Sequence, residues 1–153
     1  MPARSACVTV DVRGGGVVKT MLVCYEERPV ARRVLERAAE LAQAFDARVI
    51  VTSVAPVIHG RGVGPYDPVD PPSRHQEEAN EAAAMLAELG VGDVETVVGL
   101  GEPAHSIVDL ADEREVDLIV LGAHDGGLFS RLLEGSIGDR VAHKAHTDVL
   151  IVH

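Results

Sequence analysis

The chain has 153 residues, 46 % of them hydrophobic, which is the size and composition of one domain with its own core. A formal net charge of -10, without a Lys/Arg cluster, disfavours binding to nucleic acid or to an anionic membrane surface. No apolar run approaches the roughly 18 residues of a membrane span, and the N-terminus lacks a signal-peptide pattern, so we expect a cytoplasmic protein.

The first sixteen residues predict an extension in front of the main domain. Residues 5–12, SACVTVDV, alternate in polarity as a short edge strand does, and RGGG then breaks the pattern. An extra strand, a flexible arm and a misplaced start codon all remain open as explanations. We therefore divide the chain into an N-terminal extension, residues 1–16, and one domain, residues 17–153.

The domain opens with a strand and a helix. Residues 17–25, VVKTMLVCY, are nearly all apolar, which predicts a strand buried on both faces of a parallel sheet. Residues 29–47 have apolar side chains at helical spacing, and Pro29 is typical of a first helical turn. The expected buried stripe of this helix is Val30, Val34, Ala38, Leu41 and Phe45.

Strands and helices then alternate to the end of the chain. A loop at residues 59–73, rich in Gly and Pro, is long enough to be a lid or a disordered flap. This alternation predicts an α/β three-layer sandwich: a five-stranded parallel sheet of order 3-2-1-4-5 with helices on both faces, Rossmann-like. The later strands are expected at 48–57, 94–101, 116–122 and 148–152, and the later helices at 74–90, 102–115 and 136–146.

A ligand crevice is expected where the strand order reverses, at the carboxyl ends of strands 1 and 4. Strand 1 ends at Tyr25 and Glu26, and strand 4 ends at Leu121 and Gly122. A glycine-rich segment, GAHDGGLFSRLLEGSIG at residues 122–138, begins at this position.

Two interpretations of the glycine-rich segment remain open. The last helix should begin near Ser136, where unpaired amides and the helix dipole stabilise an anion. Gly135 would let the backbone come close, Ser136 can donate to a phosphate oxygen, and Arg131 could reach across the site. The spacing from Ser136 to Asp139 is equally typical of a capping box.

The chain resembles the universal stress protein family. Nucleotide-binding members carry Gly-x2-Gly-x9-Gly-Ser/Thr after the fourth strand, and this sequence has Gly122, Asp125, Gly135 and Ser136 at that spacing. The stretches RRVLERAAELA, GEPAHSIVDLADEREVDLIVLG and HTDVLIVH agree as well, so that the resemblance covers residues 17–153.

The resemblance implies that the crevice binds ATP or another adenine nucleotide, with or without Mg²⁺. Gly122, Gly135 and Ser136 would hold the phosphates and ribose, Glu26 would lie by the nucleoside, and Val54 would border the adenine. The expected binding residues are Cys24, Tyr25, Glu26, Val54, Leu121, Gly122, Ala123, His124, Asp125, Arg131, Gly135, Ser136, Ile137 and Gly138.

Two positions depart from the family pattern. Glu26 is one methylene longer than the usual Asp, and Asp125 replaces the second glycine. A carboxylate about 5 Å from a phosphate charge repels it by roughly 3 kcal/mol at an effective dielectric near 20. The repulsion vanishes if Asp125 points to solvent, and it becomes useful if Asp125 helps to hold Mg²⁺. His124 could contact a phosphate or be a solvated turn residue.

Three functions are compatible with these residues: an adenine-nucleotide-binding stress protein, a dimeric interaction protein whose pocket has lost its ligand, and a slow ATPase. The chain lacks a P-loop, a nucleophile elbow and a lysine at the phosphates, so we expect no catalytic residues. Residues 148–152 are apolar and would form an exposed edge, and the resemblance implies a homodimer that pairs two such edges.

Several other residues receive a structural interpretation. Cys24 is expected to be a small buried hydrophobe, and no spacing gives His75 a role. His143 with His146 would complement a helix dipole rather than hold a metal. Glu77, Glu78, Glu81 and Glu88 are expected on the solvated face of their helix.

Overall fold

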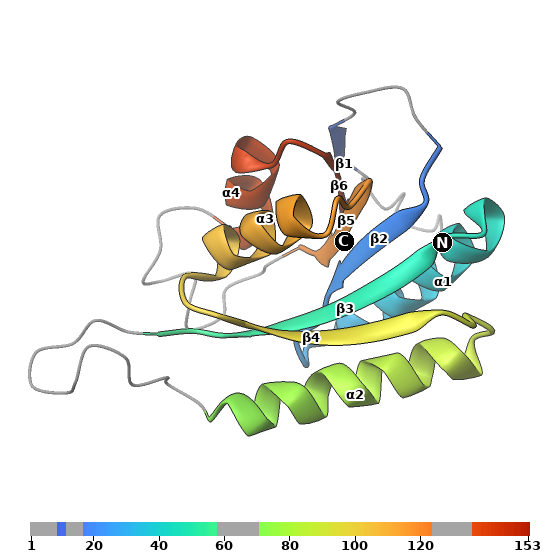
Figure 1. Cartoon of the computed structure of the whole chain (residues 1–153), viewed down its shortest axis with the longest axis horizontal. Helices are drawn as coiled ribbons and strands as arrows, with labels where there is room; N and C mark the ends of the chain where they lie inside the picture. Colours follow the sequence, from blue (N-terminus) through green and yellow to red (C-terminus); the bar gives the residue numbers. More distant parts are fainter. Residues whose placement is uncertain (1–8, 12–16, 58–70, 124–135) are drawn as a thin grey trace, which may run out of the picture.

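A computed structural model of the chain describes residues 9–11, 17–57, 71–123 and 136–153. The molecule has three layers, in which a central sheet lies between two pairs of helices (Figure 1). The strands are β1 (Thr9–Asp11), β2 (Thr20–Cys24), β3 (Arg48–Ala55), β4 (Val94–Leu100), β5 (Leu118–Gly122) and β6 (Asp148–Val152). The helices are α1 (Ala31–Phe45), α2 (Pro72–Glu88), α3 (Pro103–Glu113) and α4 (Ile137–Lys144).

The sheet has the order β1-β6-β5-β2-β3-β4. All pairings from β6 to β4 are parallel, and β2 lies between β3 and β5. Numbered in chain order, the five parallel strands β2 to β6 have the order 3-2-1-4-5, so the predicted topology is confirmed. The order reverses at β2 and β5, which places a switch point between them.

The N-terminal segment adds the sixth strand. β1 pairs antiparallel with β6, with Thr9 opposite Ile151 and Asp11 opposite Val149. The prediction of a short edge strand in this segment is therefore confirmed. The expectation that residues 148–152 form an exposed edge is wrong, because β1 pairs with the outer side of β6 along Val149, Leu150 and Ile151.

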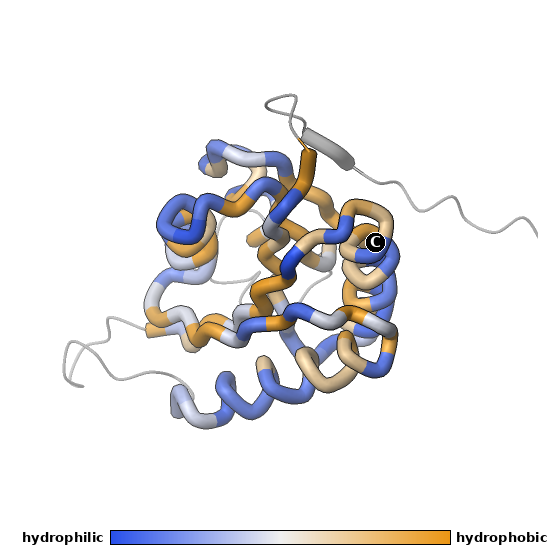
Figure 2. The backbone as a smooth tube through the Cα atoms, turned by 45° about the vertical axis from the view of Figure 1, so that its right-hand side comes forward, coloured by the Kyte–Doolittle hydropathy of each residue, from blue (hydrophilic) through white to orange (hydrophobic). Residues whose placement is uncertain are grey.

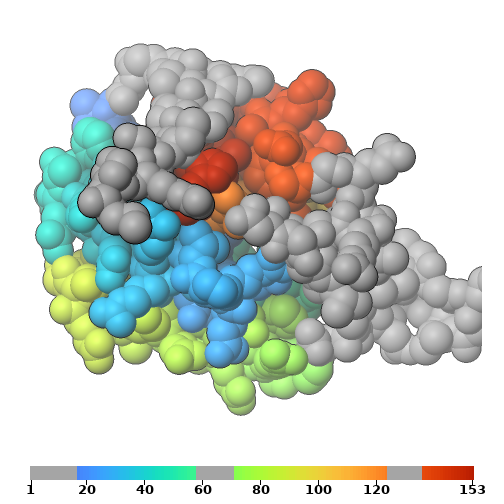
Figure 3. Space-filling model, turned by 180° about the vertical axis from the view of Figure 1, so that it is seen from behind, coloured from blue at the N-terminus to red at the C-terminus, as the bar shows by residue number. Residues whose placement is uncertain are grey.

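Each face of the sheet is covered by two helices. Leu22 and Ile119 point into one core with α3 and α4, whereas Met21 and Val23 point into the other with α1 and α2. All four side chains are fully buried, so the prediction that the first strand is buried on both faces is confirmed. Figure 2 shows apolar strands at the centre and polar outer turns on the helices, and Figure 3 shows α1 beside α2 on one face.

The first strand and helix differ from the prediction at their ends. β2 begins at Thr20 rather than at residue 17. At this start the carboxylate of Asp117 accepts hydrogen bonds from the amides of Lys19 and Thr20, both 2.9 Å. α1 begins at Ala31, with Val30 as its N-cap residue, so Pro29 precedes the helix.

The buried stripe of α1 also differs from the prediction. Phe45 is 42 % exposed, because α1 ends there and the chain turns through Asp46 in the left-handed conformation, φ 53. Four of the six buried side chains are alanines, which let the helix approach the sheet closely, and the full set is Ala31, Val34, Leu35, Ala38, Ala39 and Ala42. In the described part of the chain, no helix combines the length and apolarity needed to cross a membrane.

Candidate functional site

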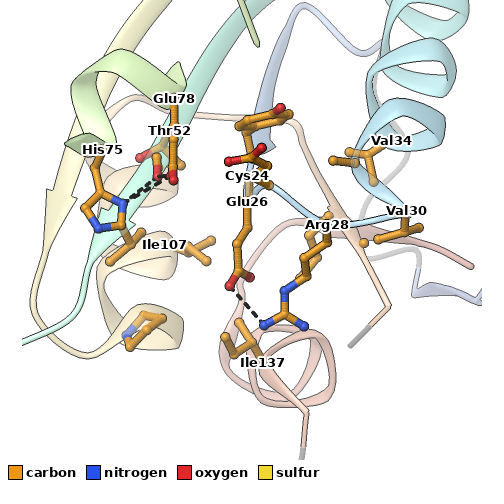
Figure 4. A pocket seen from close by; sticks show the side chains of 18 of the residues that line it. Cys24, Glu26, Arg28, Val30, Val34, Thr52, His75, Glu78, Ile107 and Ile137 are labelled. Carbon is orange, nitrogen blue, oxygen red and sulfur yellow. Dashed lines mark hydrogen bonds and ion pairs between the residues drawn. The ribbon is translucent and has the colours of Figure 1, made fainter. Parts of the chain in front are cut away.

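A cavity of about 210 Å³ lies at the switch point, where β2 and β5 end (Figure 4). Its walls come from the turn between β2 and α1, the end of β3, and the first turns of α1, α2, α3 and α4. The structure places these predicted site residues along it: Cys24, Tyr25, Glu26, Val54, Leu121, Gly122, Ala123 and Ile137. The strand-order rule therefore located the cavity correctly.

The other predicted site residues divide into two groups. His124, Asp125, Arg131 and Gly135 lie outside the described residues. Ser136 and Gly138 are described, and both have structural contacts. The Ser136 Oγ accepts a hydrogen bond from the Asp139 amide at 3.0 Å, which confirms its predicted capping role.

Two glycines at the site permit close packing. A Cβ at Gly138 would lie 3.2 Å from Ile151 Cδ1, so this glycine lets α4 pack against β6. A Cβ at Gly122 would lie 2.7 Å from Val30 Cγ1 and 3.2 Å from Val34 Cγ2. Gly122 thus has a packing reason to be glycine, in addition to its place on the cavity wall.

An ion pair lies in the turn that follows β2. Arg28 Nη2 is 2.9 Å from Glu26 Oε1, and the Arg28 side chain is 19 % exposed. Figure 4 shows both side chains extending toward the end of the cavity where Ile137 begins α4. Sequence reasoning identified Glu26 and missed Arg28, although an arginine two residues after an expected site carboxylate was a usable signal.

A second polar cluster, made by Ser53, His75 and Glu78, lies on the cavity wall where β3 meets α2. The Ser53 hydroxyl donates to Glu78 Oε2 at 2.9 Å and lies 2.8 Å from His75 Nδ1. Because the single hydroxyl proton goes to Glu78, the His75 Nδ1–H must donate to the Ser53 oxygen. The other ring nitrogen, Nε2, is buried and has no hydrogen-bond partner among the described residues.

The Ser53 cluster corrects two sequence-based expectations. The Glu78 side chain is only 12 % exposed, so it does not belong to the solvated face of α2. His75, to which no role was given, is 8 % exposed, and its unpartnered Nε2 is available for a hydrogen bond to a ligand. The spacing of His75 and Glu78, one helical turn apart, was the signal that could have revealed the cluster.

Burial sets the protonation of two cavity residues. It raises the pKa of the Cys24 thiol to about 12, so this side chain stays a neutral thiol at physiological pH. Burial also raises the pKa of the Tyr25 phenol, with smaller contributions from the carboxylates of Glu81, Glu27 and Glu78. Neither group is an activated nucleophile.

The described residues contain no cluster of three or more His, Cys, Asp or Glu side chains that could hold a metal ion. His146, one of the two histidines considered for a metal, has its Nδ1 3.2 Å from Asp112 Oδ2. That contact joins the C-terminal end of α4 to α3. His143 and Lys144 lie in the last turn of α4, as the dipole interpretation predicts.

The parallel sheet wound on both faces, with a cavity at its switch point, defines a doubly wound α/β protein of the kind that binds ligands at the carboxyl ends of its strands. The model of the universal stress protein family matches residues 18–153. The chain belongs to the universal stress protein family.

Several relatives are similar over most of their length. A universal stress protein of Methanocaldococcus jannaschii is 29 % identical, covering 91 % of this chain and 84 % of the relative. One of Mycobacterium tuberculosis is 30 % identical, covering 88 % of this chain and 96 % of the relative.

Two solved structures of family members contain adenine nucleotides. A universal stress protein in complex with cAMP superposes with a TM-score of 0.71 at 27 % identity, covering 90 % of this chain and 99 % of that one. The universal stress protein from Archaeoglobus fulgidus in complex with dAMP has a TM-score of 0.64 at 26 % identity, covering 90 % of this chain and 100 % of that one.

Proposed function

We propose that this chain is a cytoplasmic stress-response protein that binds an adenine nucleotide, ATP or a related one, in the switch-point cavity. One observation carries the proposal: the cavity lies at the carboxyl ends of β2 and β5, and Gly122, the first glycine of the family's nucleotide motif, lines it. The cAMP and dAMP complexes of similar proteins support the same ligand class.

The cavity is small for a ligand the size of a whole nucleotide. At about 210 Å³ it is smaller than the roughly 300–1,000 Å³ of common ligand pockets. The nucleoside would occupy the enclosed part, with the phosphates extending toward the beginning of α4, where the helix dipole favours an anion. No described residue is placed to act as a nucleophile at the phosphates, so binding rather than catalysis is proposed.

Titration calorimetry of the purified protein tests this function. We expect heat with ATP, AMP and cAMP, measured with and without Mg²⁺, and none with GTP as the matched control. Mass spectrometry should also find an adenine nucleotide in the protein as purified. Absence of both signals would overturn the proposal and favour the interaction protein, whereas rapid steady-state phosphate release would favour the ATPase.

A homodimer through the C-terminal strand β6 is part of the proposal. In such a dimer the partner's β6 would compete with β1 for the outer edge of β6. Because β1 occupies the outer side of β6, two β6 strands can pair only after β1 has moved away.

Removing residues 1–16 is therefore expected to increase dimer formation, because it exposes the β6 edge. Light scattering over a concentration series should show a mass of twice the truncated chain. A matched control lacking only residues 1–8 retains Thr9–Asp11 and should keep the lower dimer fraction of the 16.2 kDa full chain. Equal dimer fractions in the two truncations would contradict the competition.

A further inference from the structure

We propose that Arg28 is a phosphate-binding residue of this site, which exchanges its partner Glu26 for the phosphate of a bound nucleotide. The inference rests on the proposed nucleotide function and names the side chain that recognises the ligand's charge.

The position of Arg28 meets the first requirement, which is access to the cavity. Its side chain lines the cavity from the turn between β2 and α1, and it is anchored there because the Arg28 carbonyl accepts a hydrogen bond from the Ala31 amide at 2.9 Å. Only 19 % of the side chain is exposed, and this partial burial strengthens its interaction with an anion.

The charges around the cavity give the second reason. Among the described residues, two arginines line the cavity. Arg74 lies at the start of α2 and is half-exposed, with its Nε 3.6 Å from Glu78 Oε1. Arg28 lies on the other side, toward Ile137 and the beginning of α4 (Figure 4). A phosphate between Arg28 and the beginning of α4 would therefore meet the guanidinium on one side and the amides of the α4 N-terminus on the other.

The present partner of Arg28 can be replaced at low cost. Only one hydrogen bond joins the guanidinium to Glu26, and the Glu26 side chain is 47 % exposed. Ion pairs with so exposed a member contribute little to stability. A guanidinium has five N–H donors in a planar fork that matches two phosphate oxygens, so a phosphate offers Arg28 a better geometry than this single contact.

Ser136 can assist without losing its capping role. Its Oγ accepts from the Asp139 amide, and its hydroxyl proton remains able to donate to a phosphate oxygen. Arg28 thus supplies a cation for the phosphate from the turn after β2, a segment in which sequence reasoning assigned Tyr25 and Glu26 to the site.

Calorimetry with adenosine and AMP isolates the phosphate contribution as the ratio of the two dissociation constants. In the wild type we expect AMP to bind at least about tenfold more tightly, with a ratio that falls as salt is added. Arg28→Ala should reduce the ratio by roughly tenfold to a hundredfold while adenosine affinity stays the same, as expected for charge-assisted hydrogen bonds. Arg28→Lys keeps the charge but lacks the planar fork of N–H donors, so its ratio should lie between those of the wild type and Arg28→Ala.

The matched control is Arg32→Ala. Arg32 is an exposed arginine of α1 that pairs with Glu36 and does not line the cavity, so its removal should leave the ratio unchanged. A ratio in Arg28→Ala equal to that of the wild type, with both proteins folded and binding adenosine, overturns the role of Arg28 alone. Failure of every adenine compound to bind the wild type overturns the proposed function, and the role of Arg28 with it.

Discussion

Replacing Asp125 by glycine is expected to tighten ATP binding by up to about a hundredfold. Asp125 stands where nucleotide-binding members of the family have their second motif glycine. A carboxylate about 5 Å from a phosphate charge opposes binding by roughly 3 kcal/mol at an effective dielectric near 20. Titration calorimetry at low salt should show the gain for ATP and a smaller one for AMP, which carries less charge.

Asp125→Asn separates charge from backbone freedom, because it removes the charge and retains the size of the side chain. Adenosine should bind equally to the wild type and both variants, since it carries no phosphate. Unchanged ATP affinity in Asp125→Gly would mean that the carboxylate faces solvent. Weaker binding of ATP, confined to solutions with Mg²⁺, would instead indicate that Asp125 helps to hold the metal.

Gly122→Ala is expected to destabilise the fold by roughly 1–3 kcal/mol, the usual cost of overpacking. The added Cβ would lie 2.7 Å from Val30 Cγ1, closer than van der Waals contact allows. Valine cannot easily turn away, because its side chain branches at Cβ and is stiff at χ1. Denaturant unfolding should show a lower midpoint with an unchanged slope.

A double-mutant cycle identifies the physical cause. Val30→Ala removes the methyl groups that the new Cβ would strike, so the double variant should recover most of the stability lost by Gly122→Ala. Strictly additive losses would show that the contact with Val30 is not responsible.

The prediction of the fold succeeded because its signals are local and repeated. Apolar runs such as residues 17–25 indicate strands buried on both faces, and the alternation of strands with amphipathic helices leaves few topologies for a parallel sheet. The ends of elements were less predictable. Pro29 is compatible with a first helical turn, yet α1 begins two residues later, at Ala31.

The location of the candidate site was also predictable, because the carboxyl ends of parallel strands around a switch point always meet at one place. That rule brought Glu26, Val54 and Gly122 to a single cavity although they are distant in sequence. Which other side chains reach the cavity depends on the rotation and depth of each helix. Local sequence does not encode those quantities, so Glu78 was assigned to solvent although it binds Ser53 inside.

For this protein, the order of polar and apolar residues alone determined the fold class, the strand order and the position of the cavity, because each follows from periodicity and chain connectivity. Only the tertiary structure decided that β1 covers β6 and that His75 and Glu78 turn inward to Ser53. These contacts join segments whose sequences are independent of one another, and their partners are selected by packing in three dimensions.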